Sequence, residues 1–170
     1  MVNQHTHEYF LELYQPHHQK LLSYCESILK DPVDAQDLVS ETVLIAYEQL
    51  GKLKKEASFK YFLFGIARNL IRRLQRRKKF WGIFSSEQAE SISIRPSVEA
   101  NEDIQLLYQA LEQLPLVQKE ALILFEISGY NIKEIAEIQQ SSITAIKSRL
   151  SRGRQKLGKI LSTEKTLAYE

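Results

Sequence analysis

The sequence contains few of the residues that break helices or cross-link chains. Its 170 residues include six glycines and four prolines, and long stretches hold neither, which favours helices over a turn-rich β fold. Cys25 is the single cysteine, so no disulfide can form within the chain, and we expect a reducing, cytoplasmic compartment. No apolar run approaches the roughly 18 residues that a membrane span requires. The polar segment 1–10 also lacks the layout of a signal peptide.

What the chain does have is enough apolar sequence for a core and a strongly segregated charge. Hydrophobic residues make up 44%, and the net charge is only +2. Residues 1–50 nevertheless hold eight acidic residues against two basic ones, whereas residues 52–79 hold eleven basic residues against one acidic residue. Residues 147–159 hold six basic residues and no acidic one. Two basic blocks behind an acidic first third predict two contacts with polyanions and one contact of another kind.

The chain is organised around a polar, serine-rich stretch, 85–103, which contains Pro96 and predicts a flexible linker. Apolar residues recur at helical spacing on both sides of it, and no alternating pattern is long enough for a sheet. We therefore expect an all-α fold of two small helical domains, 1–84 and 104–162, with 163–170 as a tail. The expected helices span residues 8–29, 33–50, 59–79, 104–114, 115–125, 132–138 and 141–157.

The segment "SSITAIKSRLSRGRQKL", 141–157, begins with small residues and ends crowded with cations. On a helical wheel Ile143, Ile146, Leu150 and Leu157 form one narrow stripe, which we expect to pack inward. A helix that enters the major groove needs a small polar tip near the bases and cations near the phosphates. A short helix and a tight turn at 139–141 come before it, which predicts a helix-turn-helix. The alternative is an ordinary amphipathic helix with a solvated basic face.

The second basic block combines cations with aromatic residues. One face of the expected helix is apolar and should pack inward: Leu63, Ile66, Ala67, Leu70, Ile71 and Leu74. The other face is polar and mostly basic: Arg68, Asn69, Arg72, Arg76 and Lys79. Aromatic rings accept unpaired bases while cations follow the backbone, so this pattern suits a nucleic acid with unstacked bases. Core aromatics under a solvated face are the alternative, which fits Phe62 and Phe64 better than Tyr61.

The segment "DAQDLVSETVLIAYEQL", 34–50, carries an acidic stripe of Asp34, Asp37, Glu41 and Glu48. Three aliphatic residues border the stripe: Leu38, Leu44 and Ile45. The opposite side should face the core with Val39, Val43, Ala46 and Leu50. Carboxylates edged by exposed aliphatics predict a protein-docking surface, and the alternative is a solvated negative face. Neither His nor Cys lies at ligand spacing within the segment, which argues against a metal or acid–base site.

Three segments in this order resemble one family over nearly the whole chain. They are "DAQDLVSETVLIAYEQL", "FKYFLFGIARNLIRRLQRRKK" and "LPLVQKEALILFEISGYNIKEIAEIQQSSITAIKSRLSRGRQKL". Together they resemble the extracytoplasmic-function (ECF) group of bacterial RNA polymerase sigma factors in the sigma-70 family. The resemblance implies a sigma factor that binds core RNA polymerase and directs promoter recognition, DNA melting and transcription initiation. It implies as partners the beta-prime clamp helices and the beta subunit of the polymerase, promoter DNA and an anti-sigma factor. It implies no enzyme activity, no cofactor and no small-molecule substrate.

The resemblance also implies roles for individual residues. Contacts with core polymerase are implied for Asp34, Asp37, Leu38, Glu41 and Thr42. Contacts with the minus-ten element are implied for Lys60, Tyr61, Arg68, Asn69, Arg72 and Arg76. Contacts with the minus-thirty-five element are implied for Ser142, Thr144, Ala145, Lys147, Ser148, Arg149 and Arg152. The turn "QQSS" before the last helix has no glycine where the family commonly has one, so a non-glycine residue must take any positive φ there.

Other interpretations explain less of the chain. A dimeric helix-turn-helix regulator explains neither the second basic block nor the acidic helix. An RNA-binding adaptor explains the basic and aromatic segments but not the helix-turn-helix. His5, His7, His17 and His18 could form a metal site, although surface histidines are the simpler interpretation. Cys25 is most simply a buried apolar residue.

Overall fold

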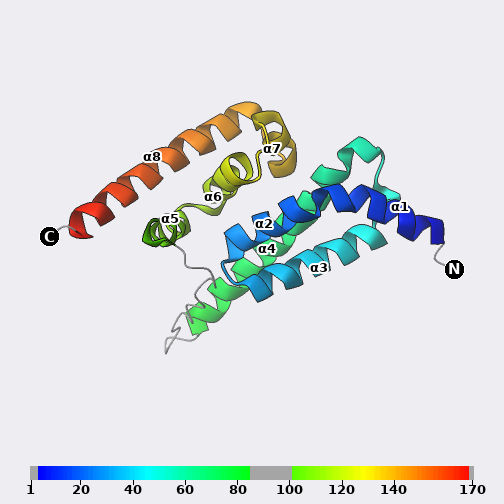
Figure 1. Ribbon diagram of the computed structural model, residues 1–170, viewed down its shortest axis with the longest axis horizontal. Helices are drawn as coiled ribbons and strands as arrows, with labels where there is room; N and C mark the ends of the chain where they lie inside the picture. The colour runs from blue at the N-terminus through cyan, green and yellow to red at the C-terminus, as the bar shows by residue number, and fades with distance from the viewer. Residues whose placement is uncertain (1–3, 85–100, 169–170) are drawn as a thin grey trace. The chain divides into compact units, whose positions relative to one another are not determined.

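The computed structural model describes residues 4–84 and 101–168, which form two compact units, Met1–Arg95 and Pro96–Glu170 (Figure 1). Both units are built from helices, and the described residues contain no strand, so the expected all-α fold is confirmed. The expected linker, 85–103, lies outside the described residues except for its last three positions.

The first unit begins with two helices where the sequence predicted one. Helix α1 spans Gln4–Tyr14, a 3₁₀ turn covers Gln15–His17, and α2 spans His18–Leu29. The prediction of a continuous helix was wrong because Pro16 has no backbone N–H to continue the α-helical hydrogen bonds. In α2, Cys25 is fully buried, as expected. Burial, with a smaller effect of Glu26, raises the pKa of Cys25 to about 12.

Helix α3, Pro32–Glu48, packs against both α2 and α4. Asp31 caps the helix, because its carboxylate accepts hydrogen bonds from the backbone N–H groups of Val33 and Asp34, at 2.8 and 3.2 Å. Pro32 follows at the first helical position, where its missing N–H has no cost. The helix therefore starts at a defined residue, which fixes the register of its acidic stripe.

Helix α4, Phe59–Phe84, is longer than the expected 59–79 and follows two 3₁₀ turns, Leu50–Lys52 and Glu56–Ser58. Its first turns hold the core of the unit. The ring of Phe59 lies 5.8 Å from that of Phe10 at an interplanar angle of 76°, and the ring of Phe64 lies 5.4 Å from that of Tyr24. These aromatic contacts anchor the start of α4, while its later turns extend beyond the core.

The second unit contains α5 (Glu102–Glu112), α6 (Leu116–Leu122), a π-helical turn (Ile123–Ile127), α7 (Ile132–Gln139) and α8 (Ile143–Ala168). Two helices extend further than expected. Asn101 caps α5, so this helix starts inside the expected linker, and α8 continues through most of the expected tail. The π-helical turn was not predicted, because the pattern of apolar residues does not distinguish it from an α-helix.

The predicted helix-turn-helix is formed by α7 and α8. Asn131 and Glu134 cap α7 reciprocally, and Gln140 ends it in the left-handed conformation, with φ +49° and ψ +50°. A non-glycine residue therefore does take the positive φ of this turn, as the sequence required. Gly153 of α8 lies against α6, where an added Cβ would come 3.0 Å from Leu122 Cδ1. The absence of a side chain at this position lets the two helices approach closely.

Candidate nucleic-acid interfaces and protein-docking surface

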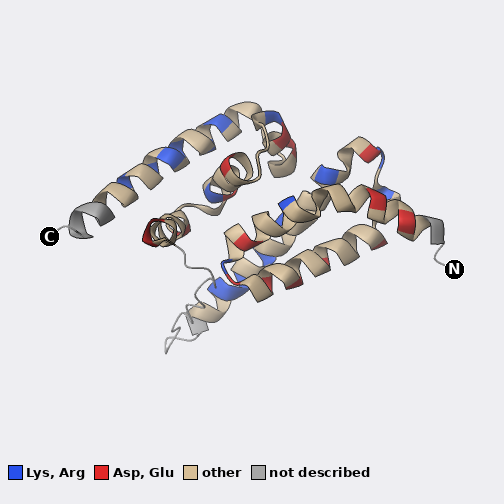
Figure 2. Cartoon of the chain, viewed as in Figure 1, with Lys and Arg blue, Asp and Glu red and all other residues tan. Residues whose placement is uncertain are grey.

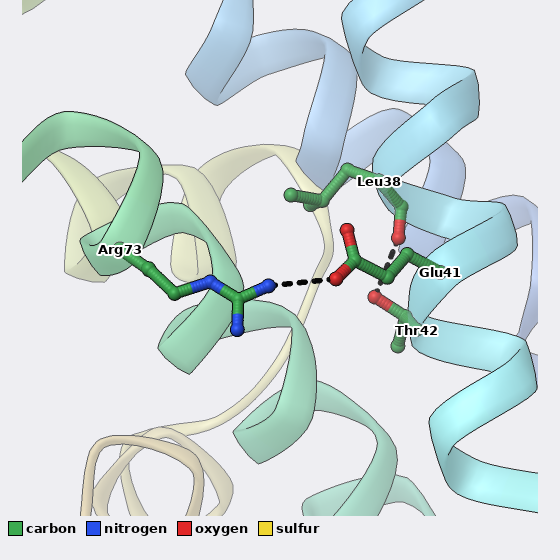
Figure 3. Close-up of polar contacts among 4 residues, drawn as sticks. All are labelled: Leu38, Glu41, Thr42 and Arg73. Atoms are coloured by element: carbon green, nitrogen blue, oxygen red, sulfur yellow. Dashed lines mark hydrogen bonds and ion pairs between the residues drawn. The ribbon is translucent and has the colours of Figure 1, made fainter. Parts of the chain in front are cut away.

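The acidic stripe of α3 lies on the surface of the first unit, with Asp34, Asp37 and Glu41 exposed. Two of these carboxylates pair with cations of α4. Glu41 Oε1 accepts a hydrogen bond from Arg73 at 2.8 Å (Figure 3), and Asp34 Oδ2 lies 3.7 Å from Lys78 Nζ. Asp37 makes no ion pair within the part of the chain that the structure describes. Its charge is therefore available to a partner.

Two residues of the expected docking set are not on this surface. Leu38 is 2% exposed and Thr42 is fully buried, so the expectation that Leu38 borders the stripe as an exposed aliphatic was wrong. Both lie on the same helical face as Ala35 and Ala46, which packs inward. The Thr42 hydroxyl donates to the carbonyl oxygen of Leu38 at 2.7 Å, which satisfies it inside the core (Figure 3).

Two other aliphatic side chains of α3 are exposed beside the acids. Val33 is 64% exposed and Leu44 is 56% exposed. Leu44 was expected here, but Val33 was missed because it precedes the segment in which the stripe was recognised. By helical spacing, Val33, Asp37 and Leu44 lie on one face. An unpaired carboxylate between two exposed aliphatics is the combination that a docking surface needs.

The basic face of α4 is formed by fewer residues than expected. Asn69 and Arg76 are exposed, and Arg72 is half-buried. Arg68 was expected on this face, but it is only 4% exposed. It lies one helical turn from both Phe64 and Ile71, which are fully buried, so its side chain starts within the core face.

The start of α4 brings a cation and a ring together. Lys60 and Tyr61 are half-buried, and Lys60 Nζ lies 5.1 Å from the centre of the Tyr61 ring. Phe64 is fully buried, which confirms it as a core aromatic, whereas Phe62 is half-buried. The part-exposed Tyr61 lies at the N-terminal end of the basic face, where an unpaired base could stack on it.

The tip of α8 combines small polar residues with one exposed aliphatic. Ser142 caps the helix by accepting a hydrogen bond from the backbone N–H of Ala145 at 3.1 Å, and Thr144 and Lys147 are exposed. Ile143 is 43% exposed, so the expectation that it packs inward was wrong, whereas Ile146 is fully buried. Ile143 is the first residue of α8, about one turn before the buried Ile146. Its exposure adds an apolar group that suits a thymine methyl in the major groove.

Among the other expected minus-thirty-five residues, Arg149 is held by the protein itself. Its Nη1 donates to Gln139 Oε1 at 2.7 Å, and Gln139 Nε2 donates to Glu120 Oε2 at 3.2 Å and to the Val117 carbonyl at 3.1 Å. Gln139 is 4% exposed and Glu120 is fully buried. This network joins α6, α7 and α8, so Arg149 positions the helix rather than standing free. Ala145 and Ser148 are half-buried, and Arg152 is exposed.

A further contact that the sequence did not reveal ties α8 to the π-helical turn. Arg154 Nη2 donates to Glu126 Oε1 at 2.7 Å, and the guanidinium carbon lies 5.2 Å from the centre of the Phe125 ring. The π-helical turn presents both side chains to α8, and no α-helical pattern predicts that geometry. Arg154 is thereby held against its own unit, which leaves Lys147 and Arg152 as the exposed cations near the tip.

Helices α3 and α8 carry charges of opposite sign. Figure 2 shows only acidic bands on α3 and only basic bands on the coloured part of α8. In the described residues, no three His, Cys, Asp or Glu side chains converge as a metal site, and no helix is long and apolar enough to cross a membrane. The acidic surface of α3 is therefore distinct from the basic surfaces of α4 and α8.

Comparison with known proteins assigns both units. The Sigma-70 region 2 family matches residues 13–80, and the Sigma-70, region 4 family matches residues 104–157. The ECF RNA polymerase sigma factor EcfG of Rhodopseudomonas palustris (strain TIE-1) is 33% identical over 128 residues, which cover 75% of this chain and 71% of that protein. The chain belongs to the ECF sigma factors. As a sigma factor, it directs promoter recognition and transcription initiation by RNA polymerase.

Other sigma factors are similar over a larger share of the chain. RNA polymerase sigma factor NccH of Alcaligenes xylosoxydans xylosoxydans is 30% identical over 162 residues, which cover 91% of this chain and 87% of that protein. The sigma factor RpoE of Bartonella quintana, solved in complex with the anti-sigma factor NepR, has a TM-score of 0.75 and 29% identity over 90% of this chain and 96% of that chain. CnrH, solved with the cytosolic domain of CnrY, has a TM-score of 0.71 and 23% identity over 95% of this chain and 91% of that chain. This similarity supports the fold alone.

Both regions of a sigma factor are thus present in one chain. A dimeric regulator would account only for the helix-turn-helix, and an RNA-binding adaptor only for the basic and aromatic helix. The two family matches together decide against both alternatives.

Proposed function

We propose that this ECF sigma factor uses α3, α4 and α8 for three separate contacts. The acidic face of α3 docks on core RNA polymerase, at the beta-prime clamp helices, through Asp34, Asp37 and Glu41 with Val33 and Leu44 beside them. Leu38 and Thr42 support this face from within the core. The observation that carries the proposal is the contrast between α3, whose charged residues are all acidic, and α4 and α8, whose coloured parts in Figure 2 carry only basic charges.

The α4 face takes the minus-ten element. Asn69, Arg72 and Arg76 follow the exposed side of the helix, and Lys60 with Tyr61 lies at its start. Rings and cations favour unpaired bases, so this face binds melted DNA better than duplex DNA. Differential binding of this kind shifts the promoter towards the open form without enzymatic chemistry. Arg68, being buried, supports the face and does not contact DNA.

The tip of α8 reads the minus-thirty-five element as duplex. Ser142, Thr144, Ala145 and Ser148 lie where a helix in the major groove meets base edges, while Lys147 and Arg152 meet phosphates. Arg149 holds the helix in place through Gln139. This assignment separates residues that read bases from residues that anchor or position the helix.

The protein acts in the cytoplasm as a non-enzymatic polymerase subunit that also contacts the beta subunit and is held in check by an anti-sigma factor. The RpoE structure from Bartonella quintana, a sigma factor bound to an anti-sigma factor, supports the last point. A protein that binds this chain and blocks its association with core polymerase would be such a regulator.

The decisive experiment measures the affinity of the full chain for sigma-free core RNA polymerase. Asp37→Arg reverses a charge of the α3 face that makes no ion pair in the described residues, and it should weaken core binding by roughly tenfold, with the chain still folded by circular dichroism. Glu12→Arg makes the same charge change on the exposed surface of α1 and is the matched control. Equal core binding by Asp37→Arg and the control would remove α3 as the docking surface.

A further inference from the structure

The C-terminal part of α4 exposes two large aromatic side chains. Phe80 is 58% exposed and Trp81 is 65% exposed, and their ring centres lie 6.4 Å apart at an interplanar angle of 84°. The core of the first unit ends before these positions, because no residue of α4 after Ile71 is buried as far as the structure describes the helix. Adjacent aromatics with more than half of their surface in solvent mark an interaction site more often than a core.

The two rings continue two rows of cations along the helix. At a spacing of four residues, Phe80 follows Arg72 and Arg76, while Trp81 follows Arg73 and Arg77. Arg76 and Arg77 are exposed, and no acidic residue occurs between Arg72 and Trp81. A polyanion with flat apolar groups fits such rows, because cations follow the phosphates while the rings take the bases.

We propose that Phe80 and Trp81 form a base-stacking site for single-stranded DNA, beyond the face that takes the minus-ten element. This inference rests on the proposed function of α4 and extends it by about 6 Å, the rise of the four residues from Arg76 to Phe80. In a duplex both faces of each base are covered by its neighbours, so only an unpaired base offers a face to these rings. The site therefore holds part of the melted strand.

The test uses the holoenzyme, reconstituted from the full chain and sigma-free core polymerase. Its probe is a fluorescently labelled promoter fork whose minus-ten region and adjoining bases are single-stranded, beside the fully duplex form. Phe80→Ala and Trp81→Ala should each weaken binding to the fork by roughly tenfold and leave binding to the duplex unchanged. Trp81→Phe keeps a ring and should retain most of the affinity. Ile104→Ala, which removes an exposed aliphatic of α5, is the control.

The free chain offers a second measurement, because Trp81 is its only tryptophan. Stacking on a base should quench the Trp81 fluorescence when oligo(dT) is added, and the oligo(dA)·oligo(dT) duplex should quench it less.

The outcomes separate this inference from the proposed function. If Arg72→Ala weakens fork binding while Trp81→Ala does not, the minus-ten face stands and the stacking site is wrong. If Trp81→Ala weakens fork and duplex binding equally, the contact is not base stacking. If it weakens core binding instead, the aromatic pair faces the polymerase and the inference fails.

Discussion

Helices α4 and α8 have the same length, 26 residues, and both carry a dense row of cations, yet their surroundings differ. In α4, Arg73 and Lys78 pair with carboxylates of α3 across an exposed surface. In α8, Arg149 joins a largely buried network through Gln139. Aromatic residues occur at both ends of α4, whereas α8 contains none.

This difference shows that basic charge alone does not define a nucleic-acid ligand. The exposed pairs of α4 contribute little to stability and exchange readily, which suits a surface that captures melted DNA. The buried network of α8 fixes the helix against its neighbours, which suits a rigid element that must fit the major groove. In the proposed function, the residues around the cations therefore distinguish the single-strand surface of α4 from the duplex reader of α8.

The largest expected effect tests whether the two basic helices depend on separate cores. Ile146 is fully buried in α8, so Ile146→Ala should lower the free energy of unfolding of the second unit by about 2–5 kcal/mol. Duplex binding should weaken with it. In urea titrations followed by circular dichroism, the transition of the second unit should shift while that of the first unit keeps its midpoint. A shift of both transitions would mean that the units unfold together.

The next effect compares the buried network of α8 with the exposed pairs of α4. Gln139→Ala removes the acceptor of Arg149 and a donor to the buried Glu120, and should cost about 1–3 kcal/mol. Arg73→Ala breaks an exposed pair and should cost at most about 1 kcal/mol. Denaturant titrations of both variants measure the contrast, and equal costs would contradict it.

The turn into α8 offers a smaller and stabilising change. Gln140→Gly relieves a left-handed conformation in a non-glycine residue, partly offset by the greater freedom of glycine in the unfolded chain. The second unit should gain about 0.5–1 kcal/mol in free energy of unfolding. Thermal unfolding measures the gain, and Gln155→Gly in the body of α8 should instead destabilise the unit. A loss with Gln140→Gly would show that the Gln140 side chain stabilises the turn.

The smallest expected effect is a pH dependence of stability that only the first unit should show. All four histidines belong to the first unit, and burial, followed by the nearby Lys60 and Lys20, lowers the pKa of His17. The unfolded chain then binds more protons, so the free energy of unfolding of the first unit should fall as the pH drops through about 6.5. The second unit should show no such histidine effect. His17→Gln should remove the pH dependence of the transition of the first unit in urea titrations followed by circular dichroism, and a dependence that persists would assign the effect to another group.

Much of the fold could be predicted from the sequence because helices with one buried face have a clear period. The cap at Asp31 and the left-handed turn before α8 were also predictable, since each depends on local residue chemistry. The break at Pro16 could have been predicted from the missing N–H. The π-helical turn could not, because its apolar residues fit an α-helix equally well.

The candidate surfaces were less predictable wherever burial depends on a neighbouring helix. Helix α3 packs against both α2 and α4, so its buried face includes Thr42 and also Leu38, which the sequence pattern assigned to the border of the acidic stripe. Arg68 is buried because its position adjoins Phe64 and Ile71. Ile143, by contrast, is exposed although the helical wheel places it on the buried stripe, because it lies in the first turn of α8. The spacing of apolar residues gives the direction in which the buried face of a helix points. The width and the ends of that face depend on the helices that pack against it.

Because Cys25 is buried, the rate at which its thiol reacts measures how often the first unit opens. A thiol reacts as its thiolate, and a pKa of about 12 in a fully buried side chain leaves almost none of it accessible in the folded state. Modification by a thiol reagent must therefore wait for α2 to open, so its rate follows the population of the opened unit when closing outpaces the reaction. Core polymerase, DNA or a regulator that stabilises the first unit should therefore slow the modification of Cys25.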